Sequence, residues 1–520
     1  MSRPGRWALG GALVSLVLAL ALIDPYLFTG GDNAAYYALA RALATGRGYV
    51  DLIAPGTPPE TVYPPGFPLL LVPFYWLGGG SLSVLKLESL IAGAVVLWAT
   101  WKLAREARGL PEWAAPAAVW LVGLAPVFRT YTSYVLSDMS YTAATMVALV
   151  FFQRARSAGQ ETDAEDGTTG PAASPGLGKW WVAGTLVSVL AFAVRTAGVA
   201  LLAAALLTAV IRRRWGRAVV VGAAIALAVV PWLAWTGQRP PETGSYLEQV
   251  RASDRLVPES PPMSLGEYPG RALENLAVYA FRDLPTLFWP VTPPPLAVNV
   301  FGAIAGTALV VIGAVVLARR RGLALYDLFA LLTLAILLVW PWTGNRFLLP
   351  VVPILWIVML AGLDAASRFL TGGPRVAGWA AAGLIAALAV GGALQVPGQW
   401  RETRAYLDGD ELAGYEPFYQ DYFEAARWIG DHAPEAVIAA RKPTLTWYWS
   451  GGRPSVVYPF HGDTDRTWAF LRGKGVTHIV MDPMTRLFLA PALEPHLDLV
   501  EIAHASPRRA VYVLRIAPDG

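Results

Sequence analysis

The sequence predicts a mainly α-helical polytopic membrane protein, with about eleven transmembrane helices and an α/β domain at its C-terminal end. The chain is 55% hydrophobic and only 15% charged, whereas a soluble domain carries about a quarter charged residues. Apolar runs of about twenty residues recur through residues 1–397, and about 20 such residues span a bilayer. From residue 398 onward the apolar runs are short and alternate with helix-like segments, which indicates an α/β domain.

The predicted spans are separated by polar or basic loops. They cover residues 7–27, 82–103, 113–128, 135–153, 180–194, 196–211, 217–236, 296–318, 323–342, 346–367 and 376–397. No small-residue cleavage site follows the first run, so it is expected to be a retained span. Residues 66–79 are also apolar but contain Pro68 and Pro73 and end in a run of three glycines at 78–80. We therefore predict a surface-lying or re-entrant helix there.

The basic residues between spans predict the orientation of the chain. They cluster in alternate loops, as in Arg212 to Arg214 and Arg319 to Arg321, and basic loops face the cytoplasm. The N-terminus is therefore expected to be cytoplasmic and the C-terminus extracytoplasmic. Residues 157–178 are expected to form a disordered cytoplasmic loop, because they are rich in Gly, Ala, Ser, Asp and Glu.

Two domains follow from this topology. Residues 1–397 form the transmembrane domain with outer loops 28–65 and 237–295, and residues 398–520 form the extracytoplasmic α/β domain. Helices are predicted at 419–430 and 464–474 of the second domain. Its strands are predicted at 436–440, 455–458, 477–482, 497–503 and 510–515.

Several function classes are excluded by the residues that the chain lacks. It has no cysteine, which excludes disulfides, thiolate nucleophiles and cysteine metal sites. All five histidines lie in the tail, which we define as residues 398–520. A metal in the membrane region would therefore need oxygen ligands, which suits Mg or Mn. No Gly-x-x-x-x-Gly-Lys loop is present, which argues against ATP-driven transport. The basic residues fall between spans, so no nucleic-acid partner is expected.

Asp32 is the first candidate for chemistry. It follows the first span and precedes a short amphipathic segment, Ala34 to Ala44. An acidic residue held between apolar segments at a membrane surface is a candidate functional residue. A helix N-cap is the structural alternative, and the two roles are compatible because a cap fixes the position of a carboxylate.

Asp138 is the second candidate, at the outer end of the span 135–153. It can act as a helix cap, as Ser137 can. It also lies a few residues inside an apolar helix, where an isolated charge costs about 2.5–3.5 kcal/mol at the membrane centre and less near the surface. The sequence therefore predicts a partner or a polar cavity for Asp138.

Three arginines on the predicted outer side, Arg129, Arg195 and Arg346, form the third group. Basic residues are scarce in outer loops. The arginines either extend towards lipid head groups or together bind a phosphate, for which guanidinium is well shaped. Lys86, at the outer start of span 82–103, is a further candidate for this cluster.

These residues resemble the polytopic GT-C glycosyltransferases, in particular a bacterial group related to protein O-mannosyltransferases and lipid A aminoarabinose transferases. Similar features are Asp32 after the first span, the segment Tyr37 to Gly46, Pro64-Pro65 before an apolar helix, Asp138, and the opening of a late span at 346–353. The resemblance covers about residues 1–400. Asn33 and Tyr63 depart from the Glu and Lys that the two named subgroups tend to have.

The resemblance implies an inverting transfer of a sugar from a polyprenyl-phosphate donor to a hydroxyl of a lipid, glycan or protein, at the outer face of the bacterial inner membrane. Asp32 would be the base. Arg129, Arg195, Arg346, Lys86 and Tyr63 would bind substrate, and Asp138 would orient the acceptor or hold a divalent cation. Two other classes stay open: a flippase or transporter of lipid-linked sugars, and a non-catalytic envelope assembly protein.

Overall fold

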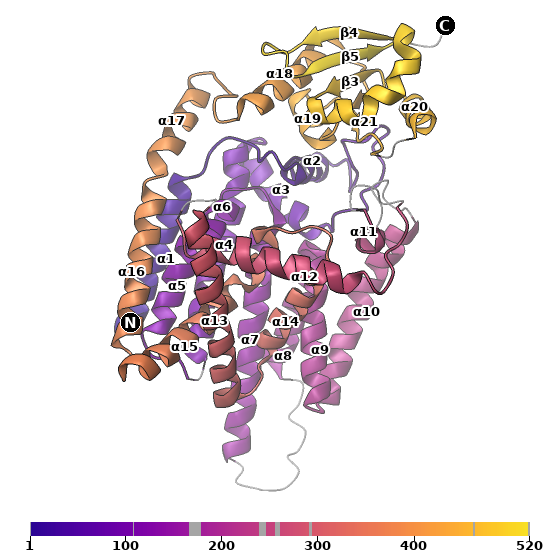
Figure 1. The fold of residues 1–520 in the computed structure, drawn as a ribbon. Helices are drawn as coiled ribbons and strands as arrows, with labels where there is room; N and C mark the ends of the chain where they lie inside the picture. Colours follow the sequence, from indigo (N-terminus) through magenta and orange to yellow (C-terminus); the bar gives the residue numbers. More distant parts are fainter. Residues whose placement is uncertain are drawn as a thin grey trace.

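The computed structural model describes residues 2–107, 109–165, 178–238, 246–254, 260–290, 294–460 and 463–517. Helices of the first four hundred or so residues stand side by side as a bundle, and the tail, from α18 onward, covers one end of it (Figure 1). Residues 166–177, most of the loop predicted to be disordered, lie outside the described residues.

Six helical segments of the described chain are long and apolar enough to cross a membrane. They are α1 (Arg3–Ala21), α4 (Leu82–Glu106), α10 (Trp215–Gln238), α13 (Leu296–Arg321), η4 with α15 (Asn345–Val351, Val352–Thr371) and α16 with α17 (Arg375–Ala393, Val396–Leu407). A seventh span results if α6 (Pro126–Thr132) and α7 (Ser137–Glu165), which are bent by 112° at their junction, are counted together.

The remaining apolar segments form shorter helices, so the predicted count of eleven full spans is not confirmed. These helices are α3 (Gly66–Gly78), α5 (Ala114–Leu124), α8 (Lys179–Val194), η1 with α9 (Thr196–Gly198, Val199–Ile211) and α14 (Leu325–Val339). The predicted span 113–128 is divided between α5 and α6, which meet at Ala125 and Pro126. Proline lacks the N–H that would continue the helical hydrogen bonds.

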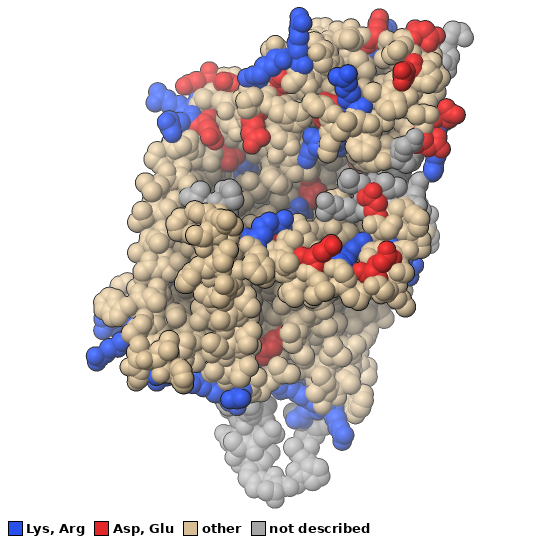
Figure 2. Space-filling view, in the orientation of Figure 1, with Lys and Arg blue, Asp and Glu red and all other residues tan. Residues whose placement is uncertain are grey.

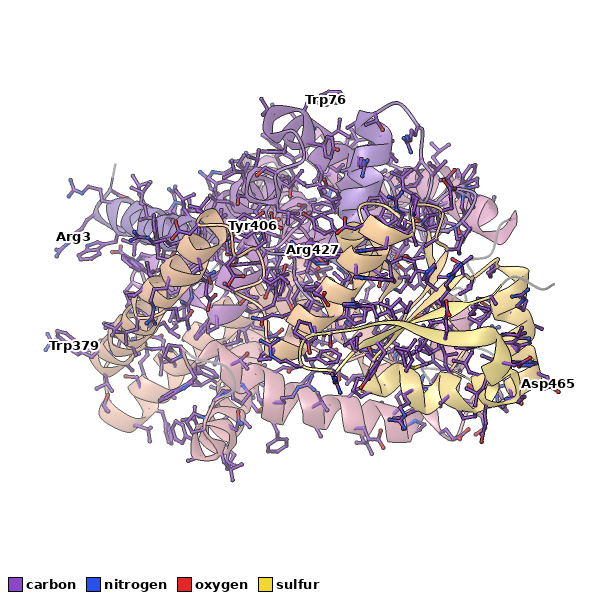
Figure 3. The ribbon with its side chains drawn as sticks, turned by 90° about the horizontal axis from the view of Figure 1, so that it is seen from above. Arg3, Trp76, Trp379, Tyr406, Arg427 and Asp465 are labelled. Carbon is purple, nitrogen blue, oxygen red and sulfur yellow. The ribbon has the colours of Figure 1, made fainter. Side chains whose placement is uncertain are left out.

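The side of the bundle is apolar, as expected of a surface that contacts lipid. Many large apolar side chains are exposed over most of their surface, among them Leu77 (81%), Leu227 (79%) and Phe369 (89%). Trp76 and Trp379 point outward at the margin in Figure 3. In Figure 2 a broad belt with few charged side chains separates the C-terminal domain from the opposite end, where Lys and Arg gather. This distribution is typical of a multi-pass membrane protein.

The predicted outer loops contain helices of their own. Loop 28–65 includes α2 (Asp32–Ala44), and loop 237–295 includes α11 (Tyr246–Arg251), α12 (Tyr268–Val278), η2 (Tyr279–Asp283) and η3 (Leu284–Leu287). The two loops contact each other, because Tyr246 Oη donates to Val62 O at 3.3 Å. Loop 28–65 also contacts the end of α10, where Trp235 Nε1 donates to Glu60 O at 2.9 Å.

The tail contains a five-stranded sheet of strand order β2-β1-β3-β5-β4. Pairs β1–β2 and β1–β3 are parallel, and pairs β3–β5 and β4–β5 are antiparallel. The strands are β1 (Ile438–Ala439), β2 (Ser455–Val456), β3 (His478–Met481), β4 (Val500–Ala505) and β5 (Tyr512–Ile516); the helices are α18 (Pro417–His432), α19 (Pro443–Trp449), α20 (Thr464–Gly473), α21 (Pro483–Leu493) and η5 (Glu494–Leu499). Helices α19 and α21 were not predicted.

The tail packs directly on α2. Trp447 of α19 is 3% exposed and forms an apolar cluster with Ala35 and Ala38 of α2. Ser455 N donates to Ile53 O at 2.8 Å, and Lys442 Nζ donates to Thr29 O at 2.7 Å. The segment before Asp32 is therefore held by the tail as well as by the bundle.

Helices α13 and α15 pack without space for a side chain at their crossing. A Cβ added to Gly313 would lie 1.9 Å from Val358 O. We expect Gly313→Ala to destabilise the protein by about 1–3 kcal/mol, the usual cost of overpacking, because backbone forms the other side of the contact. Thermal unfolding in detergent tests this. Gly383→Ala on α16, where nothing lies within 4 Å of the added Cβ, is the matched control and should unfold at or above the wild-type temperature, because alanine favours a helix over glycine.

Candidate functional site

Four charged side chains form one network at the end of the bundle that the tail covers. Arg346 Nη2 donates to Asp32 Oδ2 at 2.8 Å, and Arg346 Nε lies 3.6 Å from Asp138 Oδ1. Arg195 Nη1 lies 2.8 Å from the same Asp138 oxygen. Residues more than 300 positions apart in the sequence are thus linked in the order Asp32, Arg346, Asp138, Arg195.

The backbone at Gly31 determines the position of Asp32. Gly31 has a φ of 104° and is the N-cap residue of α2, and Asp32 is the first residue of that helix. A carboxylate is favoured there by the partial positive charge of a helix N-terminus. Gly31, and not Asp32, is thus the N-cap residue, and the Asp32 side chain accepts hydrogen bonds from Arg346 Nη2 at 2.8 Å and from Tyr63 Oη at 3.3 Å.

Asp138 lies in the first turn of α7, immediately after the 112° bend between α6 and α7. The bend turns the start of α7 away from the direction of α6. Asp138 Oδ1 approaches both arginines, whereas Asp138 Oδ2 is buried without a hydrogen-bond partner among the described residues. The partner that the sequence predicted for this buried carboxylate is therefore a pair of guanidinium groups.

The two arginines lie where helices end. Arg195 has an extended backbone (φ −153°) between α8 and η1, and Arg346 is the second residue of η4. Their guanidinium carbons lie 5.7 Å and 5.1 Å from the centre of the Phe347 ring. Arg195 Nη1 also donates to Ser137 Oγ at 3.3 Å. Both cations are thus oriented by an aromatic ring as well as by a carboxylate.

Exposure separates the roles of the two carboxylates. The Asp32 side chain is 32% exposed, and the Asp138 side chain is 3% exposed. Only the first of these can accept a proton from a group that arrives from solution. Asp138 can act on a substrate chiefly through the arginines that it holds.

The structure places two of the expected substrate-binding residues elsewhere. Lys86 is buried and binds Asp24, with Nζ 2.6 Å from Asp24 Oδ1. The guanidinium of Arg129 donates to Gln395 Oε1 and to Pro290 O, each at 3.1 Å. Both side chains connect separate parts of the chain, and neither belongs to the network of Asp32, Asp138, Arg195 and Arg346.

Further residues at the site carried no distinctive sequence signal. Tyr36 Oη and Ser137 Oγ share a hydrogen bond of 2.8 Å behind Arg195. Lys442 comes from the tail, and burial lowers the pKa of its amine, as does the charge of Arg441, while Asp32 acts in the opposite direction. The segment 34–44, which contains Tyr36, indicated only an amphipathic helix, and nothing in the sequence linked Lys442 to the transmembrane helices.

The described donor atoms do not fit a divalent-cation site. No group of three acidic or histidine side chains is positioned to hold a metal within the described ranges. The carboxylate expected to hold the ion, Asp138, lies within 4 Å of two guanidinium groups, which already supply the positive charge a phosphate needs.

Tyr63 is expected to orient Asp32. Burial raises the pKa of its hydroxyl well above the ordinary value, as does the adjacent Asp32 charge, so the hydroxyl stays protonated and donates. Tyr63→Phe should slow turnover roughly two- to tenfold, the range for losing a hydrogen bond of about 0.5–1.5 kcal/mol. Comparing steady-state rates of the two proteins tests this. Tyr75→Phe on α3, whose ring centre lies 5.9 Å from that of Tyr37 at an interplanar angle of 59°, is the control, and an equal loss there would contradict a specific role for Tyr63.

The arrangement of the helices defines the class: this is a polytopic membrane protein with the GT-C fold of membrane glycosyltransferases. Over 100% of both chains it is similar to ArnT from Cupriavidus metallidurans, at 16% identity and a TM-score of 0.55 in the apo state. The TM-score is 0.56 with the form bound to undecaprenyl phosphate.

A second solved structure has a similar fold. It is the archaeal oligosaccharyltransferase AglB from Archaeoglobus fulgidus, in complex with an inhibitory peptide and a dolichol-phosphate. The TM-score is 0.55 at 13% identity, over 98% of this chain and 74% of AglB. No protein-family model and no curated protein sequence matches the chain.

Proposed function

We propose that this protein is a glycosyltransferase that moves a sugar from a polyprenyl-phosphate donor to an acceptor hydroxyl, with inversion, at the outer face of the bacterial inner membrane. The observation that carries the proposal is the pairing of a partly exposed carboxylate, Asp32, with Arg346 at 2.8 Å, in a network with a second arginine and a buried carboxylate. In such a network the carboxylate that can act as a base is in direct contact with a guanidinium group that can bind a phosphate.

The donor phosphate would compete with Asp32 for Arg346. Guanidinium binds phosphate through two parallel hydrogen bonds, so an arriving phosphate draws Arg346 from the carboxylate. Asp32 is then a free base beside the anomeric carbon. The acceptor oxygen attacks that carbon, its proton passes to Asp32, and the bond from carbon to the phosphate oxygen breaks. The electron pair of this bond leaves with polyprenyl phosphate.

The arginines would stabilise the charge that grows on the departing phosphate. Arg195 and Arg346 are held by Asp138 and Phe347 before substrate arrives. Preorganised charges of this kind need little rearrangement during the reaction, and they favour the transition state over the ground state. Asp138 is therefore a positioning residue in this proposal, and Tyr63 positions Asp32.

The likeness to known structures supports the class of donor. ArnT was solved with undecaprenyl phosphate and AglB with dolichol-phosphate, both of which carry a phosphate on a polyprenyl chain. The acceptor is proposed only as a hydroxyl of a lipid, glycan or protein, because acceptor contacts depend on residues outside the charged network.

The test is donor consumption by the purified full-length protein in detergent. A panel of radiolabelled polyprenyl-phosphate sugars is incubated with envelope lipids, glycans and proteins, and polyprenyl phosphate release is measured together with label transfer. Release with transfer that requires Asp32 supports the proposal. Movement of an intact donor between leaflets of a vesicle, with no release in detergent, would instead identify a flippase.

A further inference from the structure

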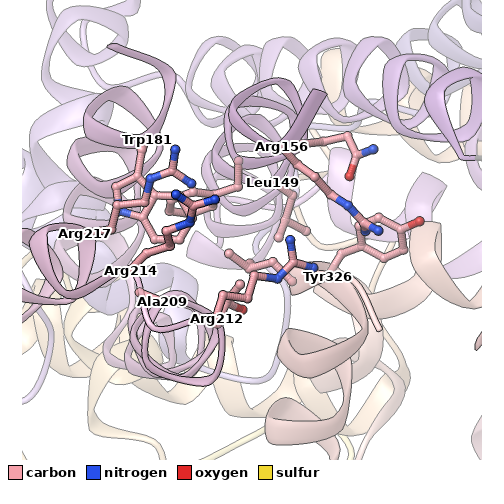
Figure 4. A pocket seen from close by; sticks show the side chains of 12 residues that line it. Leu149, Arg156, Trp181, Ala209, Arg212, Arg214, Arg217 and Tyr326 are labelled. Atoms are coloured by element: carbon pink, nitrogen blue, oxygen red, sulfur yellow. The ribbon is translucent and has the colours of Figure 1, made fainter. Parts of the chain in front are cut away.

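A second cluster of arginines lies at the opposite end of the bundle, far from the tail. It surrounds a small cavity between α7, α8, α9, α10 and α14 (Figure 4). The basic pocket, as we name it, is lined by Arg156, Arg212, Arg214, Arg217, Trp181 and Tyr326. Its volume of about 40 Å³ holds roughly three water molecules, which is comparable with one phosphate group.

Three arginines of the basic pocket have no carboxylate partner among the residues that the structure describes. No acidic residue of the described chain lines it, and none of Arg212, Arg214 and Arg217 forms an ion pair with another residue that the structure describes. Burial lowers the pKa of Arg212, and the charges of Arg217 and Arg214 lower it further. The nearby Arg321 differs, because its Nη1 lies 2.6 Å from Asp327.

Buried polar atoms of the same pocket lack partners within the described ranges. Trp181 and Tyr326 are each 4% exposed, and neither Trp181 Nε1 nor Tyr326 Oη forms a hydrogen bond with any described atom. Arg217 Nε is a third such atom, and its guanidinium lies 5.1 Å from the centre of the Trp181 ring. An unsatisfied buried donor costs about 1–3 kcal/mol. An oxyanion bound in the basic pocket could accept a hydrogen bond from each of these three atoms, and its charge would be balanced by the arginines.

Ordinary loop arginines are the alternative, because basic residues accumulate at the cytoplasmic ends of spans. Solvation or contact with an aromatic ring explains single arginines of this kind, but not several of them around one cavity whose buried indole N–H and phenol O–H groups lack described partners. Apolar surface also adjoins the cluster: Ile211, Trp215 and Val219 are 68%, 63% and 70% exposed. A ligand with a phosphate and an acyl chain can use both surfaces.

We propose that the basic pocket binds the phosphate group of an anionic lipid from the leaflet on the side opposite the tail domain. The guanidinium groups of Arg212, Arg214 and Arg217 neutralise the phosphate, and Trp181 and Tyr326 donate to its oxygens. The acyl chains lie along the exposed faces of α9 and α10. Basic pockets between transmembrane helices are suited to such head groups.

Native mass spectrometry of the full-length protein in detergent tests this site. Phosphatidylglycerol is titrated against phosphatidylcholine, and inorganic phosphate is added in a separate arm. We expect phosphatidylglycerol to bind at least tenfold more tightly than phosphatidylcholine, and excess inorganic phosphate to displace it poorly. Equal binding of the two lipids, or displacement by millimolar phosphate, would overturn a lipid ligand.

Two variants locate the binding. Combined Arg212→Gln, Arg214→Gln and Arg217→Gln should weaken phosphatidylglycerol binding more than tenfold. A control with the same loss of charge replaces Arg3, Arg6 and Arg319, exposed residues outside the pocket, with Gln and should bind as the wild type does. Equal losses in both variants would mean general charge attraction and overturn the site.

Two more variants test whether the pocket is built to hold an anionic ligand. Tyr326→Phe removes one unpartnered hydroxyl and should weaken binding two- to tenfold with an unchanged melting temperature; wild-type affinity would contradict its role.

Residues 161–166 contain four acidic residues in the sequence. Replacing these with Asn and Gln should leave lipid binding unchanged. A gain above tenfold would identify the chain's own carboxylates as the counter-charge and overturn the proposal.

Discussion

Replacing Asp32 with Asn is expected to slow sugar transfer by about 10²–10⁴-fold, the usual contribution of a general base. The amide keeps the size of the side chain and a hydrogen-bond acceptor for Tyr63, but it cannot take a proton. The Asp32 carboxylate also competes with donor phosphate for Arg346, 2.8 Å away. The variant should therefore combine a large loss of kcat with an unchanged or lowered KM for the donor, measured by release of polyprenyl phosphate.

This split between kcat and KM separates the base from a structural role. A damaged site would lose donor binding and turnover together. Asp408→Asn is the matched control, because its side chain is 73% exposed at the same end of the molecule, and it should behave as the wild type does. Transfer within about threefold of wild type by Asp32→Asn would end the assignment of Asp32 as base.

The site residues that sequence reasoning found are those for which burial is costly. Asp32, Asp138, Arg195 and Arg346 are charged residues beside apolar runs, and such residues must pair or reach water. Their grouping also followed from topology, because each falls at the same predicted end of a span. The structure brings these four together, with Asp138 3.6 Å or less from both arginines.

The same reasoning could not separate the four residues of the charged network from other charged residues near it. Lys86 and Arg129 satisfy the same criteria, yet Lys86 binds Asp24 and Arg129 binds Gln395 and Pro290. The choice between these partners depends on how helices rotate and cross, which hydropathy does not specify. The position of Lys442 near the network could not be predicted from the sequence, since its contact with Thr29 exists only when the tail packs on α2.

The helix count shows a related limit. A hydropathy window measures how apolar a segment is and does not detect where the helix bends or stops. The segment 113–128 is apolar throughout, but Pro126 begins a new helix within it. The strands of the tail could be predicted more accurately from the sequence. The short apolar runs at 477–482 and 510–515 closely match β3 and β5.

Replacing Arg346 with Gln is expected to have the second large effect. Removing one preorganised donor to a developing oxyanion typically costs about 10²–10³-fold in kcat. Arg346 also contacts both carboxylates, so its loss leaves Asp138 with Arg195 alone. Turnover should fall by about this factor and the donor KM should rise, the opposite of the change in KM expected for Asp32→Asn. Steady-state kinetics with a soluble short-chain donor measures both quantities.

A lysine at position 346 tests whether the shape of the arginine side chain matters as well as its charge. Arg346→Lys keeps the charge but not the planar fork that reaches Asp32 through Nη2 and Asp138 through Nε, so we expect it to recover donor affinity more than kcat. Arg404→Gln, an 83% exposed arginine near the same end, is the control for losing one guanidinium and should be neutral. Full activity of Arg346→Gln would show that the phosphate leaves without help from this residue, and Arg195 would then have to carry the charge alone.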